Sequence, residues 1–529
     1  MRLSLPLHIR NSADKPLGIS LPGLLALVDA HGGRAAFAGL STDDVKKRFV
    51  LPATGYTRTA YATQLLVAGS PHVAPATAFI SHAYSDEFLG VLDAVAALEA
   101  REGTSAFYYF DLLVVNQHGQ GAVVPFEVLR DEFGRSVKAI GRTLLVLRWA
   151  NPIPLQRAWC VFEMATTLAV GTGLKVLMPP VDAAAFREAL ERDFDSLTYK
   201  TCSVDVEKAR AREASDLTNI QRVIREAGGF LKTNQLVIGA MQGWMVEEGR
   251  AALTGMEVGE RGTSALISNL ARLLYTQGKL GEAEPLFFEA LVACRCKLGN
   301  DHPKTLITLN NLACLLRDQG KLDKAEPLCL EALAAYRRTL GNEHPDTLGS
   351  IGTLANLRRA QGKLEEAVPF YLEALAGSRR TLGNEHADTL GSINNLAGLL
   401  SDQGKLVEAE SLLREALIAC RRMLGNEHPD TLGTINNLAI IVSAQGNLNQ
   451  AKPLYLEALA VKRRTLGNDH PSTLNSIFNF AGLLLRQGRR EEALEQYRLE
   501  LEGVRRVFGA HHPSTQKSLR NFQQLGGVM

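Results

Sequence analysis

The chain has 529 residues with 58 Lys or Arg and 56 Asp or Glu, for a formal net charge of +2 at pH 7. This balance gives no electrostatic footprint for a nucleic acid or an anionic membrane surface, so we expect neither partner. Because no run of about 18 apolar residues is free of charge, we expect no membrane-spanning helix. The seven cysteines lack the spacing of a disulfide framework or a zinc site, so we predict free thiols, no bound metal and a cytoplasmic location.

Residues 1–74 carry no motif that indicates a fold, and we treat them as an N-terminal extension of unknown fold. Across residues 75–195, short apolar runs alternate with helical stretches. Strands are predicted at residues 77–80, 107–115, 143–149 and 174–178, and helices at residues 86–100, 125–140 and 155–170. This alternation implies an α/β doubly wound parallel sheet. Ligands bind such sheets at the carboxyl ends of the strands, where the chain carries Ser81, His82 and Trp149.

Two short motifs stand out in this part of the chain. Residues 79–86 read Phe-Ile-Ser-His-Ala-Tyr-Ser-Asp, and residues 157–164 read Arg-Ala-Trp-Cys-Val-Phe-Glu-Met. The first resembles the opening box of Toll/interleukin-1 receptor (TIR) domains, and the second resembles the Trp-Cys-x-x-Glu helix of plant-type TIR domains. The Tyr-Phe-Asp string at residues 109–111 with Asn116 and Gln117, and the Arg-x-Trp before Glu163, also resemble the related fungal heterokaryon-incompatibility domain. These resemblances imply a TIR-like, flavodoxin-like fold for residues 75–195.

The TIR resemblance implies an activity on NAD. In catalytic members of the family, the glutamate of the Trp-Cys helix supports cleavage of the nicotinamide–ribose bond, so Glu163 is the implied catalytic residue. NAD would be the substrate, Ser81, His82 and Trp149 would line its pocket, and no other cofactor is required. Many TIR domains only self-associate, which implies a homo-oligomer in place of an enzyme. The apolar residues around Glu163 then serve core packing, and the sequence leaves the two readings open.

Residues 196–262 are predicted to form a helical connector. The segment contains a charged stretch at residues 205–213 and an apolar anchor at Trp244. Its apolar content is too high for a disordered linker.

A fixed interval governs the rest of the chain. A Leu-Gly-Asn-Glu-His-Pro string recurs with small variations every 42 residues, and a Gln-Gly pair keeps the same step. The copies of the string begin at Leu298, Leu340, Leu382, Leu424 and Leu466. Each copy reads as two helices, and in the second copy Pro303 opens the first helix and Gly320 ends it. Such units must stack into a solenoid, so we predict six repeats over residues 263–510 and a capping helix over residues 511–529.

The repeat pattern resembles the 42-residue tetratricopeptide repeat found in kinesin light chains. The resemblance is carried by the string N-N-L-A-x-L-L-x-x-Q-G-K-x-x-x-A-E-P-L over residues 310–328 and by its equivalents. It implies an all-α array in which the first helix of each repeat lines a concave surface that binds a peptide or protein. The resemblance does not identify this partner, because such arrays bind unrelated peptides.

One column of the first helices is polar in every copy. It holds threonine at Thr353 and asparagine in the other copies, at Asn269, Asn311, Asn395, Asn437 and Asn479. Because an amide both donates and accepts hydrogen bonds, we predict that these asparagines hold the backbone of an extended peptide. The alternative is that asparagines bridge adjacent helices within the array.

Two further columns are predicted to be structural. Arginine pairs near the ends of the second helices complement the negative end of the helix dipole. One histidine precedes the first helix in five copies, at His302, His344, His386, His428 and His470. Because stacked helices lie about 8–10 Å apart, one metal ion cannot join two of these histidines, and we predict that they cap helices.

These features favour a protein-binding scaffold or sensor. In this hypothesis the repeat array binds a partner, and the TIR-like part signals by self-association or NAD cleavage. The alternative is a non-enzymatic adaptor or cargo-binding protein resembling kinesin light chain. No G-x-x-x-x-G-K or G-x-G-x-x-G motif follows a predicted strand, which disfavours phosphotransfer and Rossmann dehydrogenase chemistry.

Overall fold

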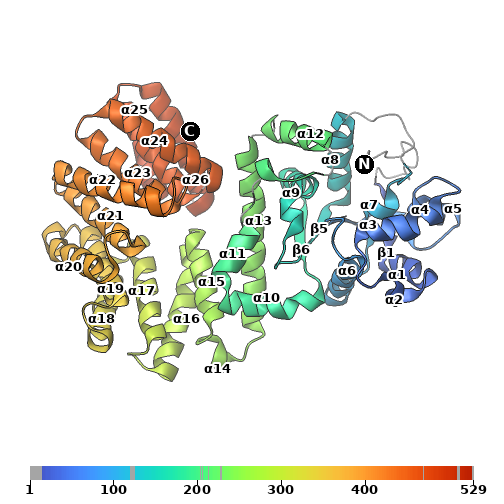
Figure 1. Ribbon diagram of the computed structural model, residues 1–529, viewed down its shortest axis with the longest axis horizontal. Coiled ribbons are helices and arrows are strands. Elements are labelled where there is room, and N and C mark those ends of the chain that lie inside the picture. Colours follow the sequence, from blue (N-terminus) through green and yellow to red (C-terminus); the bar gives the residue numbers. More distant parts are fainter. Residues whose placement is uncertain are drawn as a thin grey trace. The chain divides into compact units, whose positions relative to one another are not determined.

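The computed structural model describes residues 15–118, 126–202, 204, 206–211, 214–226, 229–468, 470–508 and 513–526. The chain divides into two compact units, Met1–Glu248 and Gly249–Met529. The first is built around a mixed sheet, and the second is all helical (Figure 1). None of the helices in the described ranges has both the length and the apolar content that crossing a bilayer requires.

Six strands form the sheet of the first unit, in the order β2-β1-β4-β3-β5-β6. They are β1 (Leu17–Ser20), β2 (Val73–Pro75), β3 (Ala78–Ser81), β4 (Phe107–Tyr109), β5 (Arg142–Val146) and β6 (Gly173–Leu177). The last four strands run parallel, with Ser81 opposite Leu145 in the register of β3 and β5. Their order matches the flavodoxin-like pattern, so the predicted parallel sheet is confirmed.

Helices cover both faces of the parallel strands, as in a doubly wound sheet. On one face of β3, Ile80 shares a core with Phe88 of α6 (Phe88–Glu102). On the other face, Phe79 contacts Phe133 of α8 (Phe126–Ile140). The helix α9 (Ala158–Val170) packs against β3 and β5. Successive strand residues point to opposite faces, which is why Phe79 and Ile80 enter different cores.

The strand predicted at residues 107–115 is wrong beyond Tyr109. Asp111 begins the short helix α7 (Asp111–Val114), and its carboxylate accepts a hydrogen bond from the N–H of Leu112 at 2.8 Å. Leu112 and Leu113 are fully buried in this helical turn. A short apolar run fits a buried strand or a buried helical turn equally well, and here the hydrogen bond between Leu112 and the Asp111 carboxylate accompanies the turn.

Residues 17–75 belong to the same sheet. β1 pairs antiparallel with both β2 and β4, and Leu24 and Leu27 of α1 (Leu21–Ala30) enter the core that holds Phe88. The predicted boundary at residue 74 therefore lies inside the sheet unit. The remaining helices of this segment are α2 (Gly33–Phe37), α3 (Thr42–Val45), the π-helical turn η1 (Lys46–Val50), α4 (Leu51–Thr54) and α5 (Tyr61–Val67).

The segment predicted as a connector is helical. Its elements are α11 (Phe194–Cys202), the 3-10 turn η3 (Val206–Lys208), α12 (Ala214–Glu226), α13 (Gly229–Thr254) and α14 (Val258–Arg261). The 3-10 turn η2 (Ile153–Gln156) and the helix α10 (Pro180–Arg192) come before it. Trp244 is buried and stacks on Phe186 of α10, with 4.9 Å between ring centroids. On α9, Trp159 Nε1 donates to Asp216 of α12 at 3.1 Å. The connector thus packs on helices that flank the sheet, and the division between the two units falls within α13.

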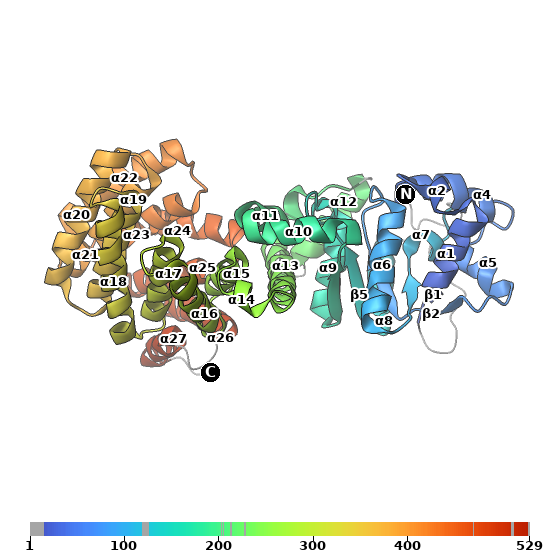
Figure 2. The same ribbon diagram turned by 90° about the horizontal axis from the view of Figure 1, so that it is seen from below.

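In the described part of the second unit, six helix pairs and a final single helix follow the end of α13 and the short helix α14 (Figure 2). The first helices of the pairs are α15 (Ala265–Thr276), α17 (Pro303–Asp318), α19 (Pro345–Ala360), α21 (Ala387–Asp402), α23 (Pro429–Ala444) and α25 (Pro471–Arg486). The second helices are α16 (Leu280–Leu298), α18 (Leu322–Leu340), α20 (Leu364–Leu382), α22 (Leu406–Met423), α24 (Leu448–Thr465) and α26 (Arg490–Phe508). The final helix, α27 (Pro513–Gln524), packs on α26. Each Gln-Gly turn places its glycine at a left-handed φ, such as +76° at Gly320, where glycine meets no steric penalty.

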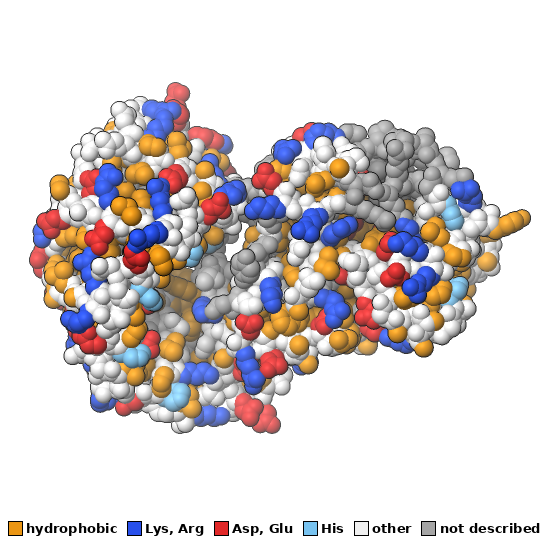
Figure 3. Space-filling view, in the orientation of Figure 1, with side chains coloured by type: hydrophobic (Ala, Val, Ile, Leu, Met, Phe, Trp, Pro, Cys, Tyr) orange, Lys and Arg blue, Asp and Glu red, His pale blue; other side chains and the backbone are white. Residues whose placement is uncertain are grey.

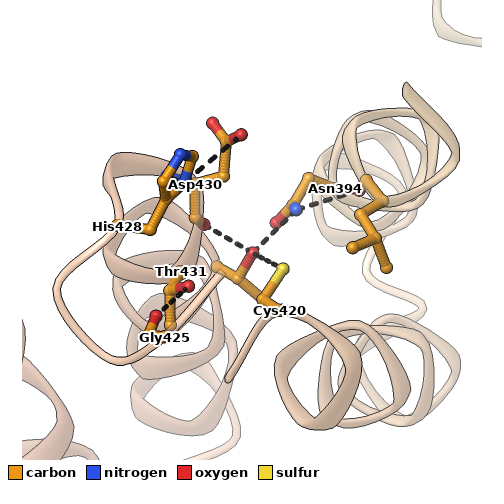
Figure 4. A network of polar contacts seen from close by, with 8 residues as sticks. Asn394, Cys420, Gly425, His428, Asp430 and Thr431 are labelled. Atoms are coloured by element: carbon orange, nitrogen blue, oxygen red, sulfur yellow. Dashed lines mark hydrogen bonds and ion pairs between the residues drawn. The ribbon is translucent and has the colours of Figure 1, made fainter. Parts of the chain in front are cut away.

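Two hydrogen bonds recur at the start of the first helices. The Nδ1 atom of each capping histidine accepts a backbone N–H two residues later, at 3.1 to 3.3 Å. A buried threonine donates to the preceding glycine carbonyl, as Thr431 does to Gly425 at 2.8 Å (Figure 4). The predicted capping role of the histidines is confirmed, and the described residues hold no cluster of metal-binding side chains.

The arginine pairs of the second helices join successive repeats. Arg337 pairs with Glu373 of the next second helix at 2.7 Å, and Arg338 pairs with Asp301 of the preceding turn. The same pairs recur as Arg379–Glu415, Arg421–Glu457, Arg380–Glu343 and Arg464–Glu427. Figure 3 shows cationic and anionic side chains interspersed over the visible face. The arginines lie in the last turns of their helices, as the prediction of a dipole-complementing role requires, and their ion pairs between repeats were not predicted. Exposed pairs of this kind contribute only about 0.2–1 kcal/mol each.

Candidate functional site

The first helices of the middle repeats form a groove. α17, α19, α21 and α23 contact one another in succession, so their faces make one continuous surface. A cavity of about 790 Å³ runs along this surface, within the size range of ligand-binding sites. Its uncharged polar lining is Asn310, Asn311, Thr353, Asn356, Ser378, Ser392, Asn394, Asn395, Thr434 and Asn437.

Three of the five predicted partner-binding asparagines line this groove. Asn311, Asn395 and Asn437 come from α17, α21 and α23, with Thr353 of α19 at the equivalent position. All three side chains are partly exposed. The other two predicted residues, Asn269 on α15 and Asn479 on α25, occupy the same column but are not part of the lining.

The neighbouring asparagine column bridges repeats. Asn310 Oδ1 accepts from Ser350 at 3.3 Å, and Asn394 Nδ2 donates to Thr434 at 2.8 Å (Figure 4). Asn437 Nδ2 also donates to Asn394 Oδ1 at 3.1 Å. The bridging alternative therefore describes this column, and Asn437 takes part in bridging while also lining the groove.

In the first unit, the structure brings Ser81 and Glu163 into contact. Ser81 lies at the carboxyl end of β3, and its hydroxyl donates to Glu163 Oε2 on α9 at 2.6 Å. Burial raises the pKa of Glu163 to about 8, the hydrogen bond from Ser81 opposes this shift, and the charge of Asp111 adds to it. A carboxyl with this pKa exchanges a proton near neutral pH, which is a property of a general acid or base.

His82 lies next to this pair in sequence and is buried. Its ring packs edge-on against Phe110, with 4.9 Å between centroids, and its Nε2 atom has no hydrogen-bond partner among the described residues. Burial lowers the pKa of His82, so the imidazole is neutral at pH 7.

Sequence reasoning missed two residues of this cluster. The Tyr84 hydroxyl donates to Asp111 Oδ2 at 2.9 Å, and the Tyr84 ring stacks beside His82. Asp111 falls within a strand predicted from the sequence, so its side chain carries no expected role there. The available signals were its place in the Tyr-Phe-Asp motif at residues 109–111 and its position as the first residue of α7.

The structure does not connect Trp149 with the Ser81–Glu163 pair. Within the described residues, its ring contacts are Phe186 of α10, at 6.2 Å between centroids, and the ammonium group of Lys200 on α11. A cavity of about 640 Å³ lies beside α9, and its lining includes Phe162 but not Glu163. The predicted pocket role of Trp149 therefore gains no support from its packing.

Models of the tetratricopeptide-repeat family match residues 263–304, 305–346, 347–421, 387–464 and 430–506. No curated protein matches the chain. Among solved structures, the chain is similar to the nearly identical TPR-like repeats of a kinesin light chain from Podosopora anserina. The identity is 30% over 39% of this chain and 97% of that chain, with a TM-score of 0.32.

Two further solved structures are similar at lower identity. BtubC (BKLC) from P. vanneervenii is 20% identical over 49% of this chain and 92% of that chain, with a TM-score of 0.31. A Rap protein complexed with Competence and Sporulation Factor is 12% identical over 65% of this chain and 96% of that chain, with a TM-score of 0.39. On the family matches and the helix pairs, residues 263–506 of this chain are tetratricopeptide repeats.

Proposed function

We propose that this chain is a protein-binding scaffold whose groove holds an extended segment of a partner protein. The observation that carries the proposal is the set of amides from Asn311, Asn395 and Asn437 along the groove. A side-chain amide donates and accepts, so it matches the alternating C=O and N–H groups of an extended backbone. Asparagine is less favourable than alanine in a helix by up to roughly 0.7 kcal/mol, and peptide binding accounts for its presence at mid-helix.

The bridging column supports the same proposal. Asn310 and Asn394 are already fixed by hydrogen bonds to Ser350 and Thr434 of the following repeats. The spacing between successive first helices is thereby set before a partner arrives. A pre-ordered site loses less conformational entropy on binding, which favours affinity.

Replacing Asn311, Asn395 and Asn437 together by Ala tests this function. Peptides selected from a random displayed library on the purified chain should lose roughly tenfold or more in affinity, because three backbone contacts of about 0.5–1.5 kcal/mol each are removed. Fluorescence anisotropy with a labelled selected peptide measures the change.

A matched control uses the asparagines of the exposed turns between repeats. Asn342, Asn384 and Asn426 have the same chemistry and the same 42-residue step, and they lie outside the groove lining. Replacing these three by Ala should leave peptide affinity unchanged. Equal affinity of both triple variants for every selected peptide would contradict the proposed function.

For the sheet unit we propose a signalling role through NAD cleavage or self-association, supported by the Ser81–Glu163 hydrogen bond at the carboxyl end of β3. The TIR-like motif pairs a hydroxyl with a carboxyl whose pKa is raised to about 8. Nicotinamide release from NAD by the purified chain, lost in Glu163→Gln, would support cleavage. If no nicotinamide is released at any protein concentration and sedimentation shows a homo-oligomer, self-association remains as the role. A chain that is monomeric and releases no nicotinamide would contradict both roles.

A further inference from the structure

The third, fourth and fifth repeats share one pattern on the groove side of their first helices. An Asp is followed three residues later by Gly and four residues after that by Asn or Thr. The three copies are Asp346, Gly349 and Thr353 on α19, Asp388, Gly391 and Asn395 on α21, and Asp430, Gly433 and Asn437 on α23. Positions spaced by three and four residues share one helix face, so each copy forms one continuous strip within the groove.

Packing within the folded chain does not require glycine at the glycine positions of these strips. A Cβ added at Gly349, Gly391 or Gly433 would meet nothing within 4 Å, and all three lie inside helices. Glycine in a helix interior is less favourable than alanine by about 1 kcal/mol. All three glycines line the groove, so the open space beside them admits the close approach of another backbone.

The charge of the groove is negative. Its lining includes Asp346, Asp388 and Asp430, and contains no Lys, Arg or Glu among the described residues. The capping histidines lie beside the three aspartates, whose carboxylates are 3.6 to 3.7 Å from the histidine Nδ1 atoms. Figure 4 shows the carboxylate of Asp430 beside the ring of His428.

Nearby arginines do not neutralise this charge. Arg317 of α17 is paired with Asp318 at 2.8 Å, and Arg359 of α19 is paired with Asp402 at 2.5 Å. The acidic position is also confined to the third, fourth and fifth repeats, because the equivalent residue is Lys304 in the second repeat and Ser472 in the sixth.

We propose that the groove binds an extended peptide segment carrying basic side chains, with one cationic group at each of Asp346, Asp388 and Asp430. The peptide backbone lies over the three glycines and is held by the amides and hydroxyl that follow them. This inference rests on the proposed function and specifies the charge and the register of the partner. The strips recur once per repeat, so the partner's basic residues are spaced along its chain instead of clustered.

The test begins with short random peptides displayed on phage and selected on the purified full-length chain. Groove binders are those that no longer bind the variant with Asn311, Asn395 and Asn437 replaced by Ala. These binders are sequenced, and the affinity of labelled copies is measured for a second variant carrying Asp346→Asn, Asp388→Asn and Asp430→Asn.

A control variant makes the same change in net charge elsewhere. Asp323, Glu408 and Glu491 occupy the first turns of the second helices α18, α22 and α26, and none lines the groove. The control variant carries Asp323→Asn, Glu408→Gln and Glu491→Gln. It therefore removes three negative charges from first turns of helices, as the groove aspartate variant does, without changing the groove. Melting temperatures of both variants confirm that they are folded.

The inference is supported if the groove binders are rich in spaced Lys or Arg. The groove aspartate variant should bind them roughly tenfold more weakly than the unmodified chain does, and the control variant should bind them as tightly as the unmodified chain does. Groove binders that are neutral or acidic, or that bind the aspartate variant at full affinity, would overturn it and leave the proposed function standing. If no selected peptide depends on the groove asparagines, the proposed function and this inference both fail.

Discussion

Lys462 of α24 occupies a position that the other repeats fill differently. The equivalent residues are Cys294, Tyr336, Ser378, Cys420 and Val504. The Lys462 side chain is 3% exposed, and its ammonium group donates to Ser476 Oγ at 3.0 Å. Burial lowers the pKa of Lys462 to about 8, because the charged form loses hydration that one hydroxyl does not replace.

This burial predicts a dependence of stability on pH. The folded pKa, about 8, lies below the unfolded value of 10.5, so the charged form penalises folding at every pH below 8. The penalty is roughly 3 kcal/mol and disappears as the pH rises from 8 to 10.5. Lys462→Met should raise the melting temperature at neutral pH. It should also reduce the increase in melting temperature that we expect of the unmodified chain between pH 8 and 10.5. A lower melting temperature for this variant would show that the ammonium group stabilises the fold.

Glu163 predicts the opposite dependence. Its folded pKa of about 8 lies above the ordinary value of 4.5, so the neutral form is the one that the fold favours. Its contribution to stability is complete below pH 4.5 and is lost as the pH rises through 8. Glu163→Gln keeps a neutral acceptor for Ser81, and the variant should melt at a higher temperature than the unmodified chain at alkaline pH. Identical melting curves across this range would contradict the buried, protonated carboxyl.

At this scale, patterns along the sequence identified residues that carry their own signal. The asparagine column and the Trp-Cys helix led to Asn311, Asn395, Asn437 and Glu163. The pattern could not show where the groove ends, so it also included Asn269, which is outside the lining. Contacts such as Tyr84 with Asp111 depend on the fold that brings together residues 27 positions apart.

Among the elements, the first helices show how a local cap sets the repeat. His428 precedes α23, and its Nδ1 accepts the backbone N–H of Asp430 at 3.3 Å. His428→Ala removes this acceptor and should destabilise the array by about 1 kcal/mol. Chemical denaturation followed by circular dichroism measures the loss, and Asn426→Ala, which changes an exposed residue of the same turn, serves as the control. An unchanged midpoint for the cap variant would contradict the capping role.

Helices and strands were predictable to different degrees. A helix of the array spans about three to five turns and recurs six times, so its apolar period is repeated often enough to be read without ambiguity. β1 and β2 have only four and three residues and no alternating pattern, and they were not predicted. Their place in the sheet comes from the pairing of β2 with β1, from the pairing of β1 with β4 and from a shared core.

For the molecule as a whole, the repeat array and the sheet unit have separate cores and separate candidate sites. Stability in an array is a sum of repeats and of the interfaces between neighbours, so a change in one repeat acts locally. The groove extends over four repeats, and its glycines place binding and helix stability in opposition. A substitution can therefore improve the fold while it fills the site.

The most direct test of the groove is the double variant Gly391→Leu with Gly433→Leu. Both positions face open space, and leucine is a better helix former than glycine, so the melting temperature should rise. The two new side chains occupy the groove, and affinity for the selected groove peptides should fall by roughly tenfold or more. A variant that is more stable and binds these peptides as tightly as the unmodified chain would contradict the account.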